Sequence, residues 1–247
     1  MQTPQPHYKK APITEAIIDF KVRWRDGIDI NAFRDIHPQI EDQFPQSELI
    51  QTNSIIIEPG PNRKIETTEQ DIGYKFTSDN QVRIFQATIE GFTFNHLTPY
   101  DSWEPFRDEA KRLWDIYRNI SPSLYVTRLA LRYVNRVEIP GPLIDYDDYF
   151  LTFPRIGASL PQVLSNFFMQ LHIPQEDLNG TLIINEAYSP SDSQNTIAVI
   201  LDFDVFCVGQ WSSDDDAGIW GLLEELRTRK NQAFEASITE ATRRLFD

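Results

Sequence analysis

Residues 84–140 carry the clearest periodic pattern in the chain, and this pattern restricts the fold to a sheet covered by a helix. A strand-like segment at 82–97 precedes a helix-like segment at 102–120, and a second strand-like segment follows at 126–139. The middle segment has apolar side chains at steps of three and four, which is typical of a helix that buries one face. The flanking segments alternate apolar and polar residues, as half-buried strands do. The apolar stripe consists of Trp103, Phe106, Ala110, Leu113, Trp114, Tyr117 and Ile120.

The segments before this region predict one more strand, a short helix and two shorter strands. Residues 13–24 are apolar at even positions and largely charged at odd positions, which favours a strand with one buried face. Residues 29–44 have helical spacing, interrupted by Pro38. Short strands are expected at 54–58 and 73–77. Within 82–97 the alternation changes phase at Gly91, which predicts a bulge or sharp twist in one continuous strand.

The segments after this region repeat the same order of elements. A short helix is expected at 144–150, and strands are expected at 164–173, 181–187 and 196–208. In the strand at 164–173 the inward residues are expected to be Phe167, Met169, Leu171 and Ile173. A long C-terminal helix is expected after the acidic run 214–216, because acidic groups are favourable at the positive end of a helix dipole.

The two halves of the chain therefore share one plan of strand, short helix, antiparallel strands and long helix. Residues 13–124 form the first half, residues 125–247 form the second, and residues 1–12 form an arm that is poorly ordered or docked. We expect one pseudo-duplicated α+β unit, with one continuous antiparallel sheet or two sheets covered by the long helices. Its layout is analogous to the TATA-box-binding or helix-grip folds.

Composition limits the classes of function that fit this chain. Asp and Glu number 37 against 23 Lys and Arg, and the net charge of −14 disfavours nonspecific binding to nucleic acid or to an anionic membrane. The single cysteine, Cys207, excludes an internal disulfide and favours a reducing compartment. No signal-peptide pattern and no long apolar run is found in the sequence. A cytoplasmic protein is therefore expected.

Four segments are similar to a sporadically distributed family of uncharacterised bacterial proteins of about this length. They are PITEAIIDF at 12–20, GFTFNHLTPYDSWEPF at 91–106, RLALRYVNRVEIP at 128–140 and LDFDVF at 201–206. The resemblance supplies no reaction. It implies carriage on mobile elements and a link to bacterial defence systems.

Three arginines on the polar face of the strand at 126–139 are the first candidate site. Arg128, Arg132 and Arg136 follow one another at about 13 Å, from a rise of about 3.3 Å per residue. They could bind phosphate, a nucleotide or a nucleic-acid backbone as an anion track. We favour the alternative that they pair with Glu15 and Asp19 on a neighbouring strand, because this pairing also explains the charged face of the first strand.

The remaining candidates are two aspartates, one histidine and one tryptophan. Asp202 and Asp204 share a strand face and could hold magnesium for phosphoryl transfer, although a solvated strand face is the favoured interpretation. His96 is the best single candidate for acid or base chemistry, with a satisfied strand-end histidine as the favoured alternative. Trp211 is a candidate exposed aromatic beside a polar run. No phosphate loop, nucleophile motif or histidine ligand pattern is found, and no cofactor is expected.

Three functional hypotheses follow from these observations. The first is a non-catalytic binding or assembly protein of a bacterial cytosolic system, acting through protein contacts with a partner that is basic or itself binds nucleic acid. The second is a nucleotide-sensing or phosphoryl-transfer domain that uses the arginines or Asp202 and Asp204. The third is an acidic mimic of nucleic acid, which needs carboxylates gathered on one surface. Self-association stays open under all three.

Overall fold

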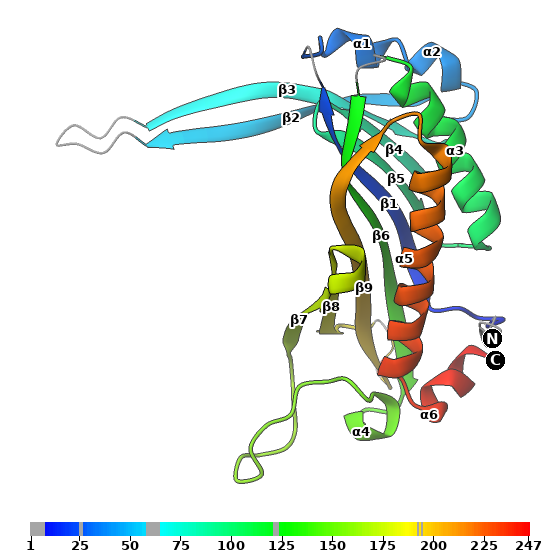
Figure 1. Ribbon diagram of the computed structural model, residues 1–247. Coiled ribbons are helices and arrows are strands. Elements are labelled where there is room, and N and C mark those ends of the chain that lie inside the picture. Colours follow the sequence, from blue (N-terminus) through cyan, green and yellow to red (C-terminus); the bar gives the residue numbers. More distant parts are fainter. Residues whose placement is uncertain (1–7, 25–26, 58–64, 121–123, 192, 194) are drawn as a thin grey trace.

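The computed structural model describes residues 8–24, 27–57, 65–120, 124–191, 193 and 195–247, and its centre is a nine-stranded antiparallel sheet (Figure 1). The order across the sheet is β2-β3-β4-β5-β1-β6-β9-β8-β7. The strands are β1 (Ile13–Trp24), β2 (Gln46–Ile57), β3 (Ile65–Thr77), β4 (Arg83–Thr88), β5 (Gly91–Leu97), β6 (Leu124–Pro140), β7 (Phe168–Gln175), β8 (Gly180–Ser189) and β9 (Thr196–Ser212). The helices are α1 (Asn31–Arg34), α2 (His37–Ile40), α3 (Trp103–Arg118), α4 (Tyr146–Tyr149), α5 (Asp216–Ser237) and α6 (Glu240–Arg243), with 3₁₀ turns at η1 (Glu176–Leu178) and η2 (Arg244–Phe246). The expectation of an α+β fold with an antiparallel sheet is confirmed.

Strands β1 and β6 pair at the middle of the sheet and join the two parts of the chain. On one side β1 pairs with β5, and on the other side β6 pairs with β9. The two strands β5 and β9 are followed in the chain by the two long helices, α3 and α5. Both helices lie along the same face of the sheet (Figure 1).

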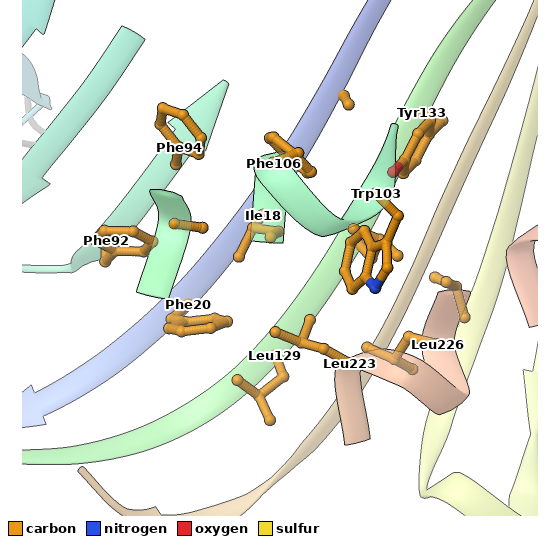
Figure 2. Packing of buried hydrophobic residues seen from close by; sticks show 14 of the residues in the cluster. Ile18, Phe20, Phe92, Phe94, Trp103, Phe106, Leu129, Tyr133, Leu223 and Leu226 are labelled. Atoms are coloured by element: carbon orange, nitrogen blue, oxygen red, sulfur yellow. The ribbon is translucent and has the colours of Figure 1, made fainter. Parts of the chain in front are cut away.

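The hydrophobic core lies between this face and the two long helices. Alternate residues of β1, among them Ile18 and Phe20, are fully buried, and their odd-numbered neighbours face the other side. Figure 2 shows how aromatic and aliphatic side chains from strands and helices interleave in this layer. Phe20, for example, packs edge-on against Trp114 of α3 and Trp220 of α5, at ring distances of 5.0 and 5.8 Å. Burial of such large side chains is the main source of stability.

The two long helices form where the sequence predicts them, with differences at their ends. In α3 the buried residues are those of the apolar stripe, apart from Ile120, which lies beyond the helix. The helix begins at Trp103 with Ser102 as its N-cap residue, so the observed start is close to the predicted start at residue 102. The N-cap side chain makes no capping hydrogen bond. In α5 the side chain of Asp215 caps the helix by accepting a hydrogen bond from the amide of Gly218 at 2.9 Å. The C-terminal segment after Ile238 turns into α6 and η2 instead of continuing α5.

The expectation of one bulged strand at 82–97 is wrong, because the segment folds back on itself as the hairpin of β4 and β5. Thr88 and Gly91 are paired across a two-residue turn. This turn explains the change of phase, since antiparallel pairing places odd-numbered Phe85 opposite even-numbered Phe94 on the core face. Gly91 is required here, because a Cβ atom would lie 2.1 Å from the carbonyl oxygen of Phe20.

Other differences concern lengths. The strands expected at 54–58 and 73–77 are parts of the much longer β2 and β3, which form a hairpin that projects from the body (Figure 1). Residue 58 lies outside the described residues. The single helix expected at 29–44 is two short turns, α1 and α2, separated before Pro38. The strand expected at 164–173 begins four residues later, and Ile173 is exposed instead of inward.

The N-terminal arm is docked from residue 8 onward, while residues 1–7 lie outside the described part. Tyr8 donates a hydrogen bond to Glu235 (2.8 Å) and its ring packs edge-on against Phe246. The amide of Lys10 donates to the carbonyl oxygen of Phe246 (2.9 Å). Among the described helices, none is both long and apolar enough to cross a membrane.

Candidate functional site

The face of the sheet opposite α3 and α5, here named the open face, carries most of the candidate residues. Because side chains alternate along a strand, the open face receives the residues between the buried ones. No described α-helix covers it in Figure 1. Its centre is formed by β1, β6 and β9, where three acidic or basic rows lie side by side. These rows contain Glu15 and Asp19 of β1, Arg128, Arg132 and Arg136 of β6, and Asp202 and Asp204 of β9.

Arg128 lies between two carboxylates. Its guanidinium donates to Asp19 at 2.8 Å on one side and to Asp204 at 3.3 Å on the other. Thr93 of β5 donates to the second oxygen of Asp19 at 2.8 Å. The guanidinium also lies over the ring of Phe206, 4.3 Å from its centroid. The cross-strand pairing of Arg128 with Asp19 that the sequence suggests is therefore present.

Arg132 makes a two-pronged contact with Asp202 of β9. Its Nε and Nη2 atoms donate to the two carboxylate oxygens at 2.8 and 2.7 Å. Asn185 of β8 donates to Asp202 Oδ2 as well, at 2.9 Å. Glu15, the partner expected from the sequence, instead accepts from Asn95 at 2.7 Å. The side chain of Asp202 is only 6% exposed, whereas that of Arg132 is 44% exposed, so the arginine shields a buried carboxylate.

Arg136 lies at the far end of the row and binds mostly neutral oxygens. It donates to the Ser189 hydroxyl and to the Pro190 carbonyl, both at 2.7 Å, and to the carboxylate of Glu138 at 3.2 Å. The three arginines thus each hold a carboxylate of the same chain. As an anion track they would have to exchange these partners for a phosphate.

Asp204 has the most unusual environment among the open-face carboxylates. Burial raises its pKa, and the neighbouring charges of Asp202 and Asp19 raise it further, while Arg128 and Arg132 lower it. Its Oδ1 atom is buried and accepts no hydrogen bond in the described part of the chain. Within that same part, no group of three or more His, Cys, Asp or Glu side chains could hold a metal ion. The magnesium hypothesis for Asp202 and Asp204 therefore lacks a third protein ligand among these residues.

A hollow of about 450 Å³ lies beside the Arg128–Phe206 stack, toward the edge of the sheet. Its lining is mostly uncharged and comes from the end of β7, the η1 turn, the start of β8 and the middle of β9. The lining residues are Pro174, Glu176, Asn179, Gly180, Thr181, Phe206 and Val208. Val208 is 43% exposed, so an apolar spot adjoins the charged rows.

His96 and Trp211 do not join the charged rows. The ring of His96 lies edge-on to Tyr100 and Phe106, and its Nδ1 atom is 2.9 Å from the carbonyl oxygen of Leu97. This geometry matches the satisfied strand-end histidine that we favour. Trp211 is partly buried, and its ring packs over Gly209, so it is less exposed than the sequence suggests.

Two buried ionisable residues lie outside the open face and are missing from the sequence-based candidates. Glu186 of β8 is 0% exposed, neither carboxylate oxygen has a hydrogen-bond partner among the described residues, and burial raises its pKa to about 8. Lys230 of α5 is 8% exposed and lies over the ring of Tyr133 at 3.7 Å. Burial lowers the pKa of Lys230 to about 7. The sequence does contain a signal for the burial of Glu186, because this charged residue follows the apolar Leu182 and Ile184 at period two.

Comparisons with protein-family models, with curated proteins and with solved structures found no match for this chain.

Proposed function

We propose that the chain is a non-catalytic binding or assembly protein that acts through protein contacts made by the open face. One observation carries this proposal: the open face combines a charged centre with an adjoining apolar spot at Phe206 and Val208. The charged groups of the centre are held in a fixed geometry by hydrogen bonds. Charged groups that are already paired favour a partner with complementary hydrogen-bonding groups over a free anion.

The internal pairing of the arginines also weighs against the alternatives. A phosphate bound at Arg132 would leave Asp202 buried without its cation, which is costly. An acidic mimic of nucleic acid needs a surface of free carboxylates, whereas those of Asp19, Asp202 and Asp204 all contact arginines. The overall charge of −14 favours a partner that is basic or itself binds nucleic acid, through electrostatic steering.

The finer features of the fold belong to the same proposal. We regard the chain as a duplicated unit of the TATA-box-binding or helix-grip type. The strand order supports this, since β1-β5-β4-β3 and β6-β9-β8-β7 follow the same sequence of connections on the two sides of the central pair. The family resemblance and a role in a bacterial cytosolic defence or mobile-element system remain part of the proposal. The single buried cysteine, Cys207, is compatible with a reducing compartment.

The test is binding of a purified partner, isolated first with the immobilised chain from its native host. Val208→Glu adds a charge to the apolar spot and should lower the affinity at least tenfold, about 1.4 kcal/mol. Leu143→Glu is the matched control, because Leu143 is 68% exposed and lies in the turn after β6, away from the sheet. Equal affinities of the wild type and Val208→Glu, or the absence of any partner, would contradict the proposal.

One observation favours a second candidate, nucleotide sensing. The hollow has a volume of about 450 Å³ and the aromatic ring of Phe206 in its lining, and the guanidinium of Arg128 lies over that ring. Thermal-shift measurements against nucleotides, with and without magnesium, test this candidate. Stabilisation that is lost in Asp204→Ala or Arg132→Ala would favour it, and no shift with any nucleotide would exclude it.

A further inference from the structure

Strand β7 forms one edge of the nine-stranded sheet, and its free side is unusual for an acidic protein. The strand has the sequence FMQLHIPQ and contains no Asp, Glu, Lys or Arg, although the chain carries a net charge of −14. Phe168 is 69% exposed and Ile173 is 38% exposed. From Phe168 to Ile173 this edge lacks the charged side chains and the proline that normally prevent edge-to-edge pairing, and only Pro174 near its end is of that kind.

The pairing of β7 with β8 shows which backbone groups are free. Phe168 is opposite Ala187, so Phe167 is opposite Tyr188, and the amide of Tyr188 donates to the carbonyl oxygen of Phe167 at 3.1 Å. Hydrogen-bonded and non-hydrogen-bonded pairs alternate along an antiparallel ladder. Odd-numbered residues of β7 therefore direct their N–H and C=O groups toward β8, and even-numbered residues direct theirs outward.

The outward residues are Phe168, Gln170, His172 and Pro174. Pro174 lacks an N–H group and lies at an outward position, as expected for a proline tolerated at a sheet edge. The other three retain both backbone groups. No backbone hydrogen bond to these groups from outside the β7–β8 ladder is found among the described residues.

We infer that β7 pairs with β7 of a second copy of this chain, antiparallel and about a twofold axis at Gln170. In this register Phe168 lies opposite His172 of the second copy, and Gln170 lies opposite its own equivalent. These three pairs are all of the hydrogen-bonded type, and each contributes two backbone hydrogen bonds. The two sheets would become continuous through one isologous contact.

The same edge of a second copy matches this edge in both its alternating backbone groups and its lack of charge. Two chains of charge −14 repel each other, and the repulsion is smallest where an uncharged strand meets an uncharged strand. The opposite edge, β2, carries Glu48, whose side chain is 60% exposed, and lies on the projecting hairpin. The segment before β7 also carries exposed apolar side chains, Leu160 (56%) and Val163 (66%). This inference does not depend on the open-face proposal, since it uses the edge of the sheet.

The experiment measures mass by sedimentation velocity over a range of concentrations. We expect the wild type to reach twice the 28.7 kDa of one chain. Gln170→Pro removes one outward N–H group and leaves the backbone hydrogen bonds to β8 in place, so it should give a monomer. Gln170→Ala keeps that N–H group and should stay dimeric, and both variants lose the side-chain hydrogen bond from Gln170 to Asn185. Thermal melting followed by circular dichroism shows whether the proline variant is folded.

A pair of charge variants tests the register without relying on proline. Gln170→Glu and Gln170→Lys each place like charges opposite one another and should each be monomeric. Their equimolar mixture should form a heterodimer, because residue 170 then meets an opposite charge across the axis. A monomeric wild type would overturn the inference. So would a dimer that survives Gln170→Pro, or two charge variants that do not associate on mixing.

Discussion

Replacing Glu186 by Gln should change how the stability of the fold depends on pH. The side chain of Glu186 is 0% exposed and has no hydrogen-bond partner among the described residues, so ionising it inside the sheet–helix layer is unfavourable. Burial raises its pKa from 4.5 to about 8. The folded state therefore binds more protons than the unfolded state between these pH values, and wild-type stability falls as pH rises through this window.

The size of the effect follows from the two pKa values. At about 1.36 kcal/mol per pKa unit, the fold loses roughly 3 kcal/mol at pH 7 and about 5 kcal/mol at pH 9, relative to acid conditions. Gln has nearly the same shape as protonated Glu and does not ionise. We therefore expect the two proteins to differ little at pH 4.5, and the free-energy difference in favour of Glu186→Gln to grow with pH up to about 8.

Urea unfolding followed by tryptophan fluorescence at several pH values between 4.5 and 9 measures this difference. Lys230 is present in both proteins, and Glu186 is not among the causes of its pKa shift, so its contribution cancels in the difference. Glu69→Gln, on the exposed part of β3, is the matched control for replacing a carboxyl group by an amide. Parallel pH profiles for the wild type and Glu186→Gln would refute the assignment of a buried, raised-pKa carboxyl.

Three further predictions follow from other features of the fold. Wild-type stability should rise between pH about 7 and 10.5, because in this range the amine of Lys230 binds a proton in the unfolded state but not in the folded state. Lys230→Met should remove this rise, and urea unfolding at several pH values measures it. Gly91→Ala should destabilise the fold by about 3 kcal/mol or more, because the new Cβ atom would lie 2.1 Å from a backbone carbonyl oxygen of β1. Gly221→Ala has open space around it in α5 and should stabilise the fold by about 0.5–1 kcal/mol. Melting temperatures of the two variants test both expectations. Arg132→Ala should cost about 2 kcal/mol in urea, since it leaves the nearly buried carboxylate of Asp202 without its cation, and no loss would contradict the shielding role.

The elements that could be predicted from the sequence are those that bury one face along their whole length. The stripe of α3 and the alternation of β1 and β6 are set by residues close in sequence, so their periods are visible without knowledge of the partners. The hairpin of β4 and β5 was missed because its turn, Ile89 and Glu90, lacks the usual Asn-Gly or Asp-Gly pattern. Gly91, interpreted as a bulge, is required by close approach to β1.

The full length of the hairpin of β2 and β3 could not be predicted, because it projects from the body and residues 46–53 and 68–71, among those described, are mostly exposed. Strands without a buried face show no alternation of apolar and polar residues, and backbone pairing alone does not require particular residue types. At the open face, the ionic pairing of the arginines could be predicted but the partner could not. Arg132 pairs with Asp202 because β6 lies between β1 and β9. Which strands become neighbours depends on residues far apart in the chain, so the local sequence pattern does not show it.

Glu186 and Lys230 show how a departure from a pattern can carry more information than the pattern. Each occupies a position that the periodicity assigns to the core, Glu186 two residues after Ile184 and Lys230 four residues after Leu226. Burial shifts their pKa values in opposite directions, so both groups tend toward the neutral form in the fold. Glu186 lowers stability as pH rises from 4.5 to about 8, and Lys230 raises stability as pH rises from about 7 to 10.5. Glu186→Gln and Lys230→Met should therefore change opposite limbs of the plot of unfolding free energy against pH. This result would distinguish the burial of these two groups from a general effect of the net charge of −14.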